Sequence, residues 1–242
     1  MTDRKPSRIL SAYRAATSFA EPLAARLLQQ RLARGKEDGD RLTERLGRPG
    51  RVRPKGPIIW IHAASVGESV SILPLIRDMG RLRPDATVLV TTGTVTSGRV
   101  MGERLPPNAF HQFVPVDTPS AVRAFLDYWK PGLALWVESE LWPNMLHETK
   151  LRQIPVVLVN ARMSDNSFKR WRRAPGMAAE LLGTFDLCLA QDETVAAKLE
   201  TLGAPRVETP GNLKLVGEPL PFDANVLGGL RAAIGGRPVW LL

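Results

Sequence analysis

The most suggestive residues for chemistry lie where a short apolar run ends. The apolar run 57–63 leads into residues 62–68 (HAASVGE). Glu68, at the end of this segment, falls where the first turn of a helix is expected. A carboxylate there could take a proton from a substrate hydroxyl, so Glu68 is a candidate general base. Ser65 would cap the helix, and Gly67 would allow a tight turn close to a substrate. An acid in a first helical turn also stabilises the helix dipole, and this purely structural role stays open.

Hydroxyl groups and glycines gather in a second loop, residues 91–98 (TTGTVTSG), which follows the β-branched run 86–92. Backbone N–H groups and hydroxyls in such a turn can bind an anion or the hydroxyls of a sugar. Thr92 and Thr94 are therefore candidate substrate-binding residues. Helix capping explains them equally well, and no Lys follows the second Gly as it would in a phosphate-binding loop.

Charged side chains follow three further apolar runs. Glu138 and Glu140 end one of them, and we expect one carboxylate to reach a cleft and the other to begin a helix. Arg162 ends the next and is a candidate clamp for a carboxylate or phosphate. Asn212 and Lys214 end the last, where Asn212 could bind substrate and Lys214 could neutralise developing negative charge.

The sequence lacks the motifs of several other enzyme classes. Its three His residues fall on separate segments, and no cluster of His, Cys and Asp has the spacing of a metal site. It contains neither GxGxxG after the first apolar run nor GxSxG, which disfavours a dinucleotide enzyme and a serine hydrolase. The single cysteine, Cys188, lies in an apolar run and is expected to be a buried, inert thiol.

The elements that would position these loops follow a regular alternation. Short apolar runs alternate with helical patterns about five times, which is typical of an α/β fold with a Rossmann-like parallel sheet and helices on both faces. The runs are continuously apolar, as expected of strands buried on both faces. Ligands of such sheets bind at the carboxyl ends of the strands. The predicted strands are 57–63, 86–92, 110–116, 133–137, 154–160, 187–190 and 207–209.

The first 55 residues form a basic segment before this sheet. They hold 14 Lys and Arg against 6 Asp and Glu, a net charge of +8 out of +9 for the chain. Apolar residues recur at spacings of three or four, so a helix here would be amphipathic. We expect it to lie on an anionic membrane surface, with Arg14, Phe19, Arg26 and Arg31 as contacts. An amphipathic helix packed on its own domain stays open, and nucleic-acid binding is not expected because the remainder is nearly neutral.

The end of the chain differs in character from the predicted sheet. Residues 217–223 (GEPLPFD) have the composition of a linker, and residues 238–242 (PVWLL) resemble the start of a buried strand without partners. We therefore predict three parts: an amphipathic basic arm over 1–55, a Rossmann-like domain over 56–216, and over 217–242 a linker with the truncated start of another domain.

Five motifs together resemble the 3-deoxy-D-manno-octulosonic acid (Kdo) transferases in order and spacing, and the resemblance runs over essentially the whole chain. The motifs are HAASVGES (62–69), TTGTVTSG (91–98), WVESELWPN (136–144), VNARMS (159–164) and GNLKL (211–215).

The resemblance implies a two-domain GT-B glycosyltransferase at the cytoplasmic face of the bacterial inner membrane. Its N-terminal half would bind the lipid A precursor, and its C-terminal half would bind the donor CMP-Kdo, without metal or other cofactor. Transfer would invert the anomeric centre, with Glu68 as base and with Glu138 and Lys214 supporting the transition state.

Because the donor-binding half would follow residue 242, the chain alone is expected to be inactive. A non-catalytic lipid-binding half-domain, and another GT-B transferase of lipid A biosynthesis, remain as alternatives.

Overall fold

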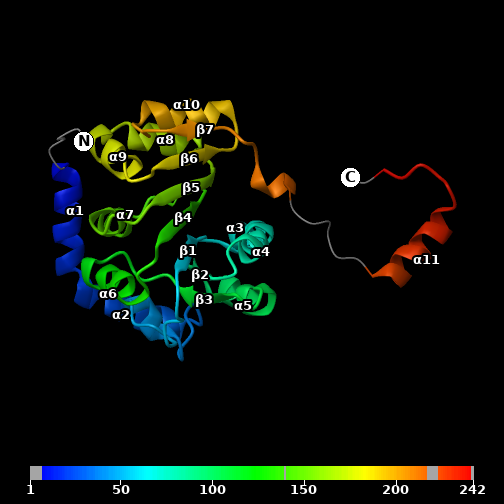
Figure 1. The fold of residues 1–242 in the computed structure, drawn as a ribbon, viewed down its shortest axis with the longest axis horizontal. Coiled ribbons are helices and arrows are strands. Elements are labelled where there is room, and N and C mark those ends of the chain that lie inside the picture. The colour runs from blue at the N-terminus through cyan, green and yellow to red at the C-terminus, as the bar shows by residue number, and fades with distance from the viewer. Residues whose placement is uncertain (1–6, 139, 217–222, 241–242) are drawn as a thin grey trace.

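A computed structural model describes residues 7–138, 140–216 and 223–240, and within them a parallel sheet forms the centre of the protein (Figure 1). The strand order is β3-β2-β1-β4-β5-β6-β7, and all pairings are parallel. This confirms the predicted α/β fold. The strands are β1 (Ile58–His62), β2 (Thr87–Thr92), β3 (Ala109–Phe113), β4 (Leu133–Val137), β5 (Val156–Ala161), β6 (Leu187–Ala190) and β7 (Val207–Glu208).

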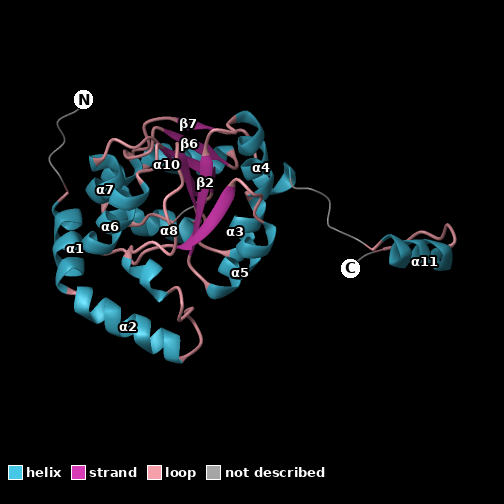
Figure 2. Cartoon of the chain, turned by 60° about the horizontal axis from the view of Figure 1, so that its bottom comes forward, coloured by secondary structure: helices cyan, strands magenta, loops and turns pink. Residues whose placement is uncertain are grey.

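Helices cover both faces of the sheet, and each face has its own hydrophobic core (Figure 2). One face carries α3 (Val66–Ser71), α4 (Leu73–Leu82) and α5 (Val95–Arg104). The other carries α6 (Pro119–Trp129), α7 (Pro143–Leu151), α8 (Asp165–Trp171), α9 (Pro175–Leu182) and α10 (Glu193–Thr201). The chain changes face between β3 and β4, so the strand order reverses between β1 and β4, where sheets of this kind leave a crevice.

Large aromatic side chains fill the core beneath that crevice. Trp60 of β1 is fully buried and packs edge-on against Trp136 of β4, with ring centroids 5.1 Å apart. Its indole N–H donates to Thr91 Oγ1 at 2.9 Å, which gives the buried donor its partner. This ring packing therefore joins β1 and β4 beneath their carboxyl ends.

The start of the chain packs directly on the domain. Helices α1 (Arg8–Phe19) and α2 (Glu21–Ala33) lie along its side in Figure 2, and Leu10 of α1 is only 2% exposed. The Tyr13 hydroxyl donates to Asp117 Oδ2 at 2.9 Å, and the same carboxylate accepts the backbone N–H groups of Asn144 (3.1 Å) and Met145 (2.9 Å) at the start of α7. One partly buried carboxylate thus ties α1 to α7.

Two of the arginines predicted as membrane contacts have partners within the protein. The Arg14 guanidinium donates to Glu148 at 2.7 Å and contacts His147 at 2.6 Å, and Arg31 pairs with Glu37 at 2.6 Å. Arg14 is thereby used to pack α1 on α7. Phe19, which is 88% exposed, and the exposed Arg26 are the predicted membrane contacts that remain free of such a role.

The segment after α2 covers the edge of the sheet at β3. It contains a 3₁₀ turn, η1 (Leu42–Leu46), in which Glu44 is 4% exposed and accepts the Phe113 backbone N–H at 2.7 Å. Arg45 donates to the Val114 carbonyl at 2.5 Å. These bonds satisfy backbone groups that an edge strand would otherwise leave open.

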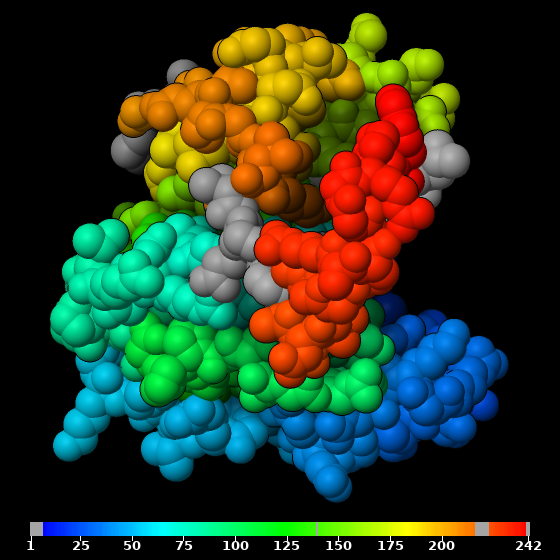
Figure 3. Space-filling view, turned by 90° about the vertical axis from the view of Figure 1, so that its right-hand side faces the viewer, coloured from blue at the N-terminus to red at the C-terminus, as the bar shows by residue number. Residues whose placement is uncertain are grey.

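Two further elements follow β7. The 3₁₀ turn η2 (Leu213–Val216) lies beside α3 and α4, where Leu213 packs on their core; Figure 3 shows this segment in orange above the cyan helices. Helix α11 (Ala224–Ile234) buries none of its residues. Among the described residues, no helix is long and apolar enough to cross a membrane. The predicted strand over 238–242 is not formed in its described part, 238–240.

Gly47, which ends η1, provides a test of the edge segment. Its φ is 78°, and a Cβ there would lie 2.0 Å from the Ala121 carbonyl oxygen of α6. We expect Gly47→Ala to lower the free energy of unfolding by about 2 kcal/mol or more. Gly102→Ala on α5, where a Cβ meets nothing within 4 Å, should leave stability unchanged or slightly higher. Urea unfolding measures both, and equal midpoints for the two variants would contradict this account.

Candidate active site

Glu68 lies at the carboxyl end of β1, in the first turn of α3, where the strand order reverses. Its Oε2 accepts the Ala64 backbone N–H at 2.8 Å, and its Oε1 accepts the Ser65 hydroxyl at 2.8 Å. Ser65 in turn accepts the Glu68 backbone N–H at 3.3 Å as the helix N-cap. The structural role considered from sequence is therefore present, and the half-buried carboxylate is held in one orientation.

The surroundings of Glu68 change its acidity. Burial raises the pKa of the Glu68 carboxyl above its ordinary value, against the hydrogen bonds from Ser65 and Ala64, which lower it. The neighbouring negative charges of Glu138 and Glu140 raise this pKa further. A carboxylate whose pKa is raised is a stronger base than an ordinary glutamate.

Glu138 and Lys214 meet at the end of the adjacent strand. Lys214 Nζ lies 2.6 Å from Glu138 Oε1, and the Lys214 side chain is 42% exposed while that of Glu138 is 11% exposed. Glu138 has a left-handed backbone (φ 62°), which few residues other than glycine adopt. The structure thus pairs Lys214 with Glu138, 76 positions earlier, and places Glu138 near enough to Glu68 to raise its pKa.

The hydroxyls of the 91–98 loop serve the loop itself. Thr92 is fully buried, and its Oγ1 bonds to His111 Nε2 and to Ser97 Oγ, both at 2.8 Å. Thr94 caps α5 by accepting the Ser97 backbone N–H at 3.1 Å. The Gly93 N–H donates to the Ala64 carbonyl at 3.3 Å and so joins this loop to the Glu68 loop. Both threonines therefore hold the loop and the start of α5 in place, as the capping alternative predicts.

The remaining candidate residues differ in their surroundings. Arg162 follows β5 directly, is exposed, and makes no hydrogen bond or ion pair with the described residues. Asn212 Oδ1 accepts the Lys214 backbone N–H at 2.9 Å, so it caps η2. The prediction of a tight turn at Gly67 is wrong, because Gly67 has helical geometry within α3. Its missing side chain does leave open space above the helix start, since a Cβ there meets no atom within 4 Å.

His62 is a second ionisable group at the end of β1, and it stays neutral. It is fully buried, and its ring packs on Trp136 and Trp142 with centroids 5.0 and 5.7 Å away. Its Nδ1 lies 3.1 Å from Thr91 Oγ1, while Nε2 has no partner among the described residues. Burial lowers the pKa of His62 to about 3. This imidazole is therefore uncharged near neutral pH.

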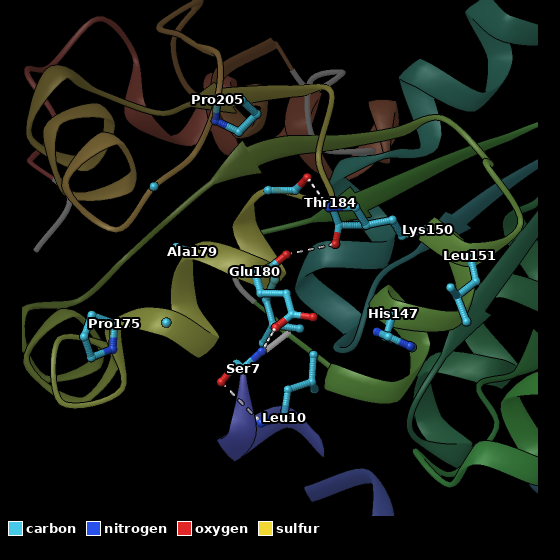
Figure 4. A pocket seen from close by; sticks show the side chains of 14 residues that line it. Ser7, Leu10, His147, Lys150, Leu151, Pro175, Ala179, Glu180, Thr184 and Pro205 are labelled. Atoms are coloured by element: carbon cyan, nitrogen blue, oxygen red, sulfur yellow. Dashed lines mark hydrogen bonds between the residues drawn. The ribbon is translucent and has the colours of Figure 1, made fainter. Parts of the chain in front are cut away.

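A cavity of about 950 Å³ lies away from these residues (Figure 4). It is lined by the start of α1, the end of α7 and α9, so it opens at the amino-terminal edge of the sheet. Its polar groups are used by the fold: the Ser7 N–H donates to Glu180 at 2.7 Å, and Lys150 Nζ donates to the Gly183 carbonyl at 3.0 Å. Within the described part of the chain, no group of three His, Cys, Asp or Glu could hold a metal ion.

Comparison with known proteins identifies close sequence relatives. Residues 40–216 match the family model described as 3-deoxy-D-manno-octulosonic-acid transferase (kdotransferase). The chain is 39% identical over 208 residues to a protein of Arabidopsis thaliana described as a probable mitochondrial 3-deoxy-D-manno-octulosonic acid transferase, covering 84% of this chain and 46% of the relative. With the 3-deoxy-D-manno-octulosonic acid transferase of Rickettsia bellii it shares 38% identity over 211 residues, covering 87% and 50%. The chain thus spans about half the length of these curated relatives.

Solved structures share the fold at low sequence identity. A UDP-N-acetylglucosamine 2-epimerase from Listeria monocytogenes aligns with a TM-score of 0.51 and 12% identity, over 73% of this chain and 52% of that one. Another UDP-N-acetylglucosamine 2-epimerase aligns with a TM-score of 0.50 and 15% identity, over 75% and 61%. The match to about half of a longer chain agrees with the expected N-terminal half of a GT-B fold.

Two substitutions should move the pKa of Glu68 in opposite directions. Ser65→Ala removes a hydrogen bond to the carboxylate, so the pKa rises further; Glu138→Gln removes a nearby negative charge, so it falls. NMR titration of the ¹³C-labelled Glu68 carboxyl measures both shifts. Ser164→Ala, which removes the equivalent cap of α8, is the matched control and should leave Glu68 unchanged. Shifts of the same sign in the first two variants would refute the assigned causes.

Proposed function

Since the chain belongs to the 3-deoxy-D-manno-octulosonic acid (Kdo) transferase family, we propose that it forms the acceptor-binding half of an inverting, metal-independent glycosyltransferase. The donor is CMP-Kdo and the acceptor is the lipid A precursor, as in lipopolysaccharide assembly. One observation carries the proposal: a carboxylate with a raised pKa, Glu68, sits at the strand-order reversal beside the paired Glu138 and Lys214.

In the proposed reaction, Glu68 removes the proton from an acceptor hydroxyl. The hydroxyl oxygen then bonds to the anomeric carbon of Kdo from the face opposite the nucleotide, which inverts that centre. The bond between the anomeric carbon and the phosphate oxygen breaks, and CMP leaves with the electron pair. No metal ion is required in this scheme, because a protein cation can balance the charge of the phosphate.

Lys214 is the cation assigned to that charge. Its ammonium has three N–H donors, of which one is directed to Glu138 at 2.6 Å, so two remain for phosphate oxygens. Glu138 pairs with the ammonium at the end of β4. The open space beside Gly67 and the unpaired Arg162 are assigned to the acceptor and to its anionic groups.

The side of the protein that carries α1 and α2 is proposed to rest on the cytoplasmic face of the inner membrane. Leu23 and Leu27 lie one turn apart on α2 and are 57% and 49% exposed, and Phe19, at the end of α1, is 88% exposed. We call these three side chains the apolar strip. Arg26 is exposed beside the strip and can meet anionic headgroups. A lipid acceptor would then reach the enzyme without leaving the bilayer.

The catalytic assignment is tested by Glu68→Gln in the complete product of the gene. With CMP-Kdo and lipid A precursor, turnover should fall by about 10²- to 10⁴-fold, which is the usual contribution of a general base. The wild-type rate should decline as pH falls through the raised pKa of Glu68, because only the deprotonated carboxylate accepts the proton. Glu103→Gln changes an exposed carboxylate on α5 and serves as the control. A Glu68→Gln enzyme with near wild-type turnover would exclude Glu68 as the base.

The membrane assignment is tested by placing a charge in the apolar strip. Phe19→Asp and Leu23→Asp should each weaken binding to vesicles with anionic lipid by about tenfold. Each change removes an apolar side chain that is proposed to insert into the lipid. Leu82→Asp on α4, where Leu82 is 79% exposed, is the matched control and should bind as wild type does. Co-sedimentation measures the bound fraction. Equal loss in all three variants would argue against a specific surface, and vesicle binding without Kdo transfer in the complete protein would favour a non-catalytic lipid-binding module.

A further inference from the structure

The position of Lys214 depends on few contacts. Among the residues that the structure describes, two hydrogen bonds join the polar groups of residues 211–216 to the rest of the domain. One runs from Lys214 Nζ to Glu138 Oε1 at 2.6 Å. The other runs from the Leu213 backbone N–H to the side-chain carbonyl of Asn160 at 2.9 Å. The other hydrogen bonds of this segment are internal.

Of these two contacts, the ion pair is the weaker anchor. The Lys214 side chain is 42% exposed, so water screens its attraction to Glu138. A lysine side chain also has many rotamers, and an ion pair alone does not select one of them. The placement of the ammonium therefore requires that the backbone at Leu213 be held by something rigid.

The Leu213 side chain packs on the core beside α3 and α4, and its backbone N–H is held by Asn160. Asn160 is 2% exposed, belongs to β5, and its own backbone carbonyl accepts Gln191 Nε2 at 3.1 Å. Because the Leu213 N–H needs an acceptor, the Asn160 amide must present its oxygen there. Its Nδ2 is then buried without a partner among the described residues. An amide kept at this cost is one whose oxygen is needed in that place.

The backbone at Asn160 supports the same conclusion. Its φ is 54°, in the left-handed region, which asparagine tolerates better than most residues with a side chain. Glu138, at the end of the neighbouring strand β4, has a φ of 62°. The two residues that contact the Leu213–Lys214 pair thus both leave strand geometry in the same unusual way, and such strain tends to gather at functional sites.

We infer that Asn160 is the positioning residue for Lys214: by fixing the Leu213 backbone, it holds the ammonium of the next residue at Glu138 and at the leaving group. Asn160 does not touch the reacting atoms. Its importance for catalysis rests on the proposed function, because only a catalytic Lys214 makes its position matter for turnover.

The structural part of this inference is tested on the 242-residue chain without any activity assay. Tryptic cleavage after Lys214 under native conditions reports how often the segment 211–216 opens, and mass spectrometry identifies the product. Asn160→Gly keeps the left-handed backbone and removes only the amide, while Asn160→Ala also adds strain. Both variants should be cleaved at least about tenfold faster after Lys214 than wild type, because the Leu213 N–H loses its acceptor.

Two controls separate this local effect from general loss of stability. Gln153 is also left-handed (φ 55°), but it is exposed and precedes β5 at the opposite edge of the sheet. Gln153→Ala should therefore cleave after Lys214 at the wild-type rate. Cleavage after Lys150, on α7, should not change in Asn160→Gly. Unchanged cleavage after Lys214 in both Asn160 variants, or an equal rise after Lys150, overturns the inference.

The catalytic part is tested in the complete gene product. Asn160→Gly should lower kcat about tenfold, with a smaller change in KM, and adding it to Lys214→Met should cause little further loss. Normal turnover of Asn160→Gly despite faster cleavage overturns the positioning role in catalysis. Normal turnover of Lys214→Met instead refutes the proposed function of Lys214, while the cleavage result still decides whether Asn160 holds the segment.

Discussion

The reversal of strand order between β1 and β4 is the constraint on which the site depends. The chain leaves these two central strands toward opposite faces of the sheet, so the loops after them diverge and leave room above the strand ends. Glu68 and Glu138 occupy that room, one from each loop, and Lys214 arrives from the far end of the domain to meet Glu138. The aromatic packing of Trp60 against Trp136 below keeps the two strand ends at a fixed separation. A change in this core would therefore reach the chemistry without touching a site residue.

A chain of hydrogen bonds extends this support from the sheet edge to Glu68. Arg41 can only donate, and its guanidinium lies 3.0 Å from His111 Nδ1, so the neutral imidazole must carry its proton on Nε2. That proton is directed to Thr92 Oγ1 at 2.8 Å. The residue after Thr92 donates to the Ala64 carbonyl, and Ala64 donates to the Glu68 carboxylate. Burial and the Arg41 charge lower the pKa of His111 to about 3, so His111 stays uncharged near neutral pH and its hydrogen bonds persist.

The sheet and the loops at its carboxyl edge could be predicted from the sequence, because continuous apolar runs and the geometry of parallel sheets fix them. The packing of the N-terminal helices could not, since the pair of Tyr13 with Asp117 is 104 residues apart and leaves no periodic signal. For Thr92, a hydroxyl in a loop looks the same in the sequence whether it faces solvent or a buried histidine. Asn160 was missed as well. Its only signal is an amide at the end of an apolar run, and its importance appears when Leu213 is seen beside it.

The Asp117 carboxylate has a consequence for how the protein would stand on a membrane. It holds Tyr13 of α1 and the first amides of α7 at once, and burial raises the pKa of this carboxyl. Helix α7 begins just after the loop of Glu138, so this carboxylate links α1 to the element that follows the acidic loop. If the apolar strip rests on lipid as proposed, the fold sets the height of Glu68 above the lipid plane. A lipid acceptor would then have to extend its sugar to that height.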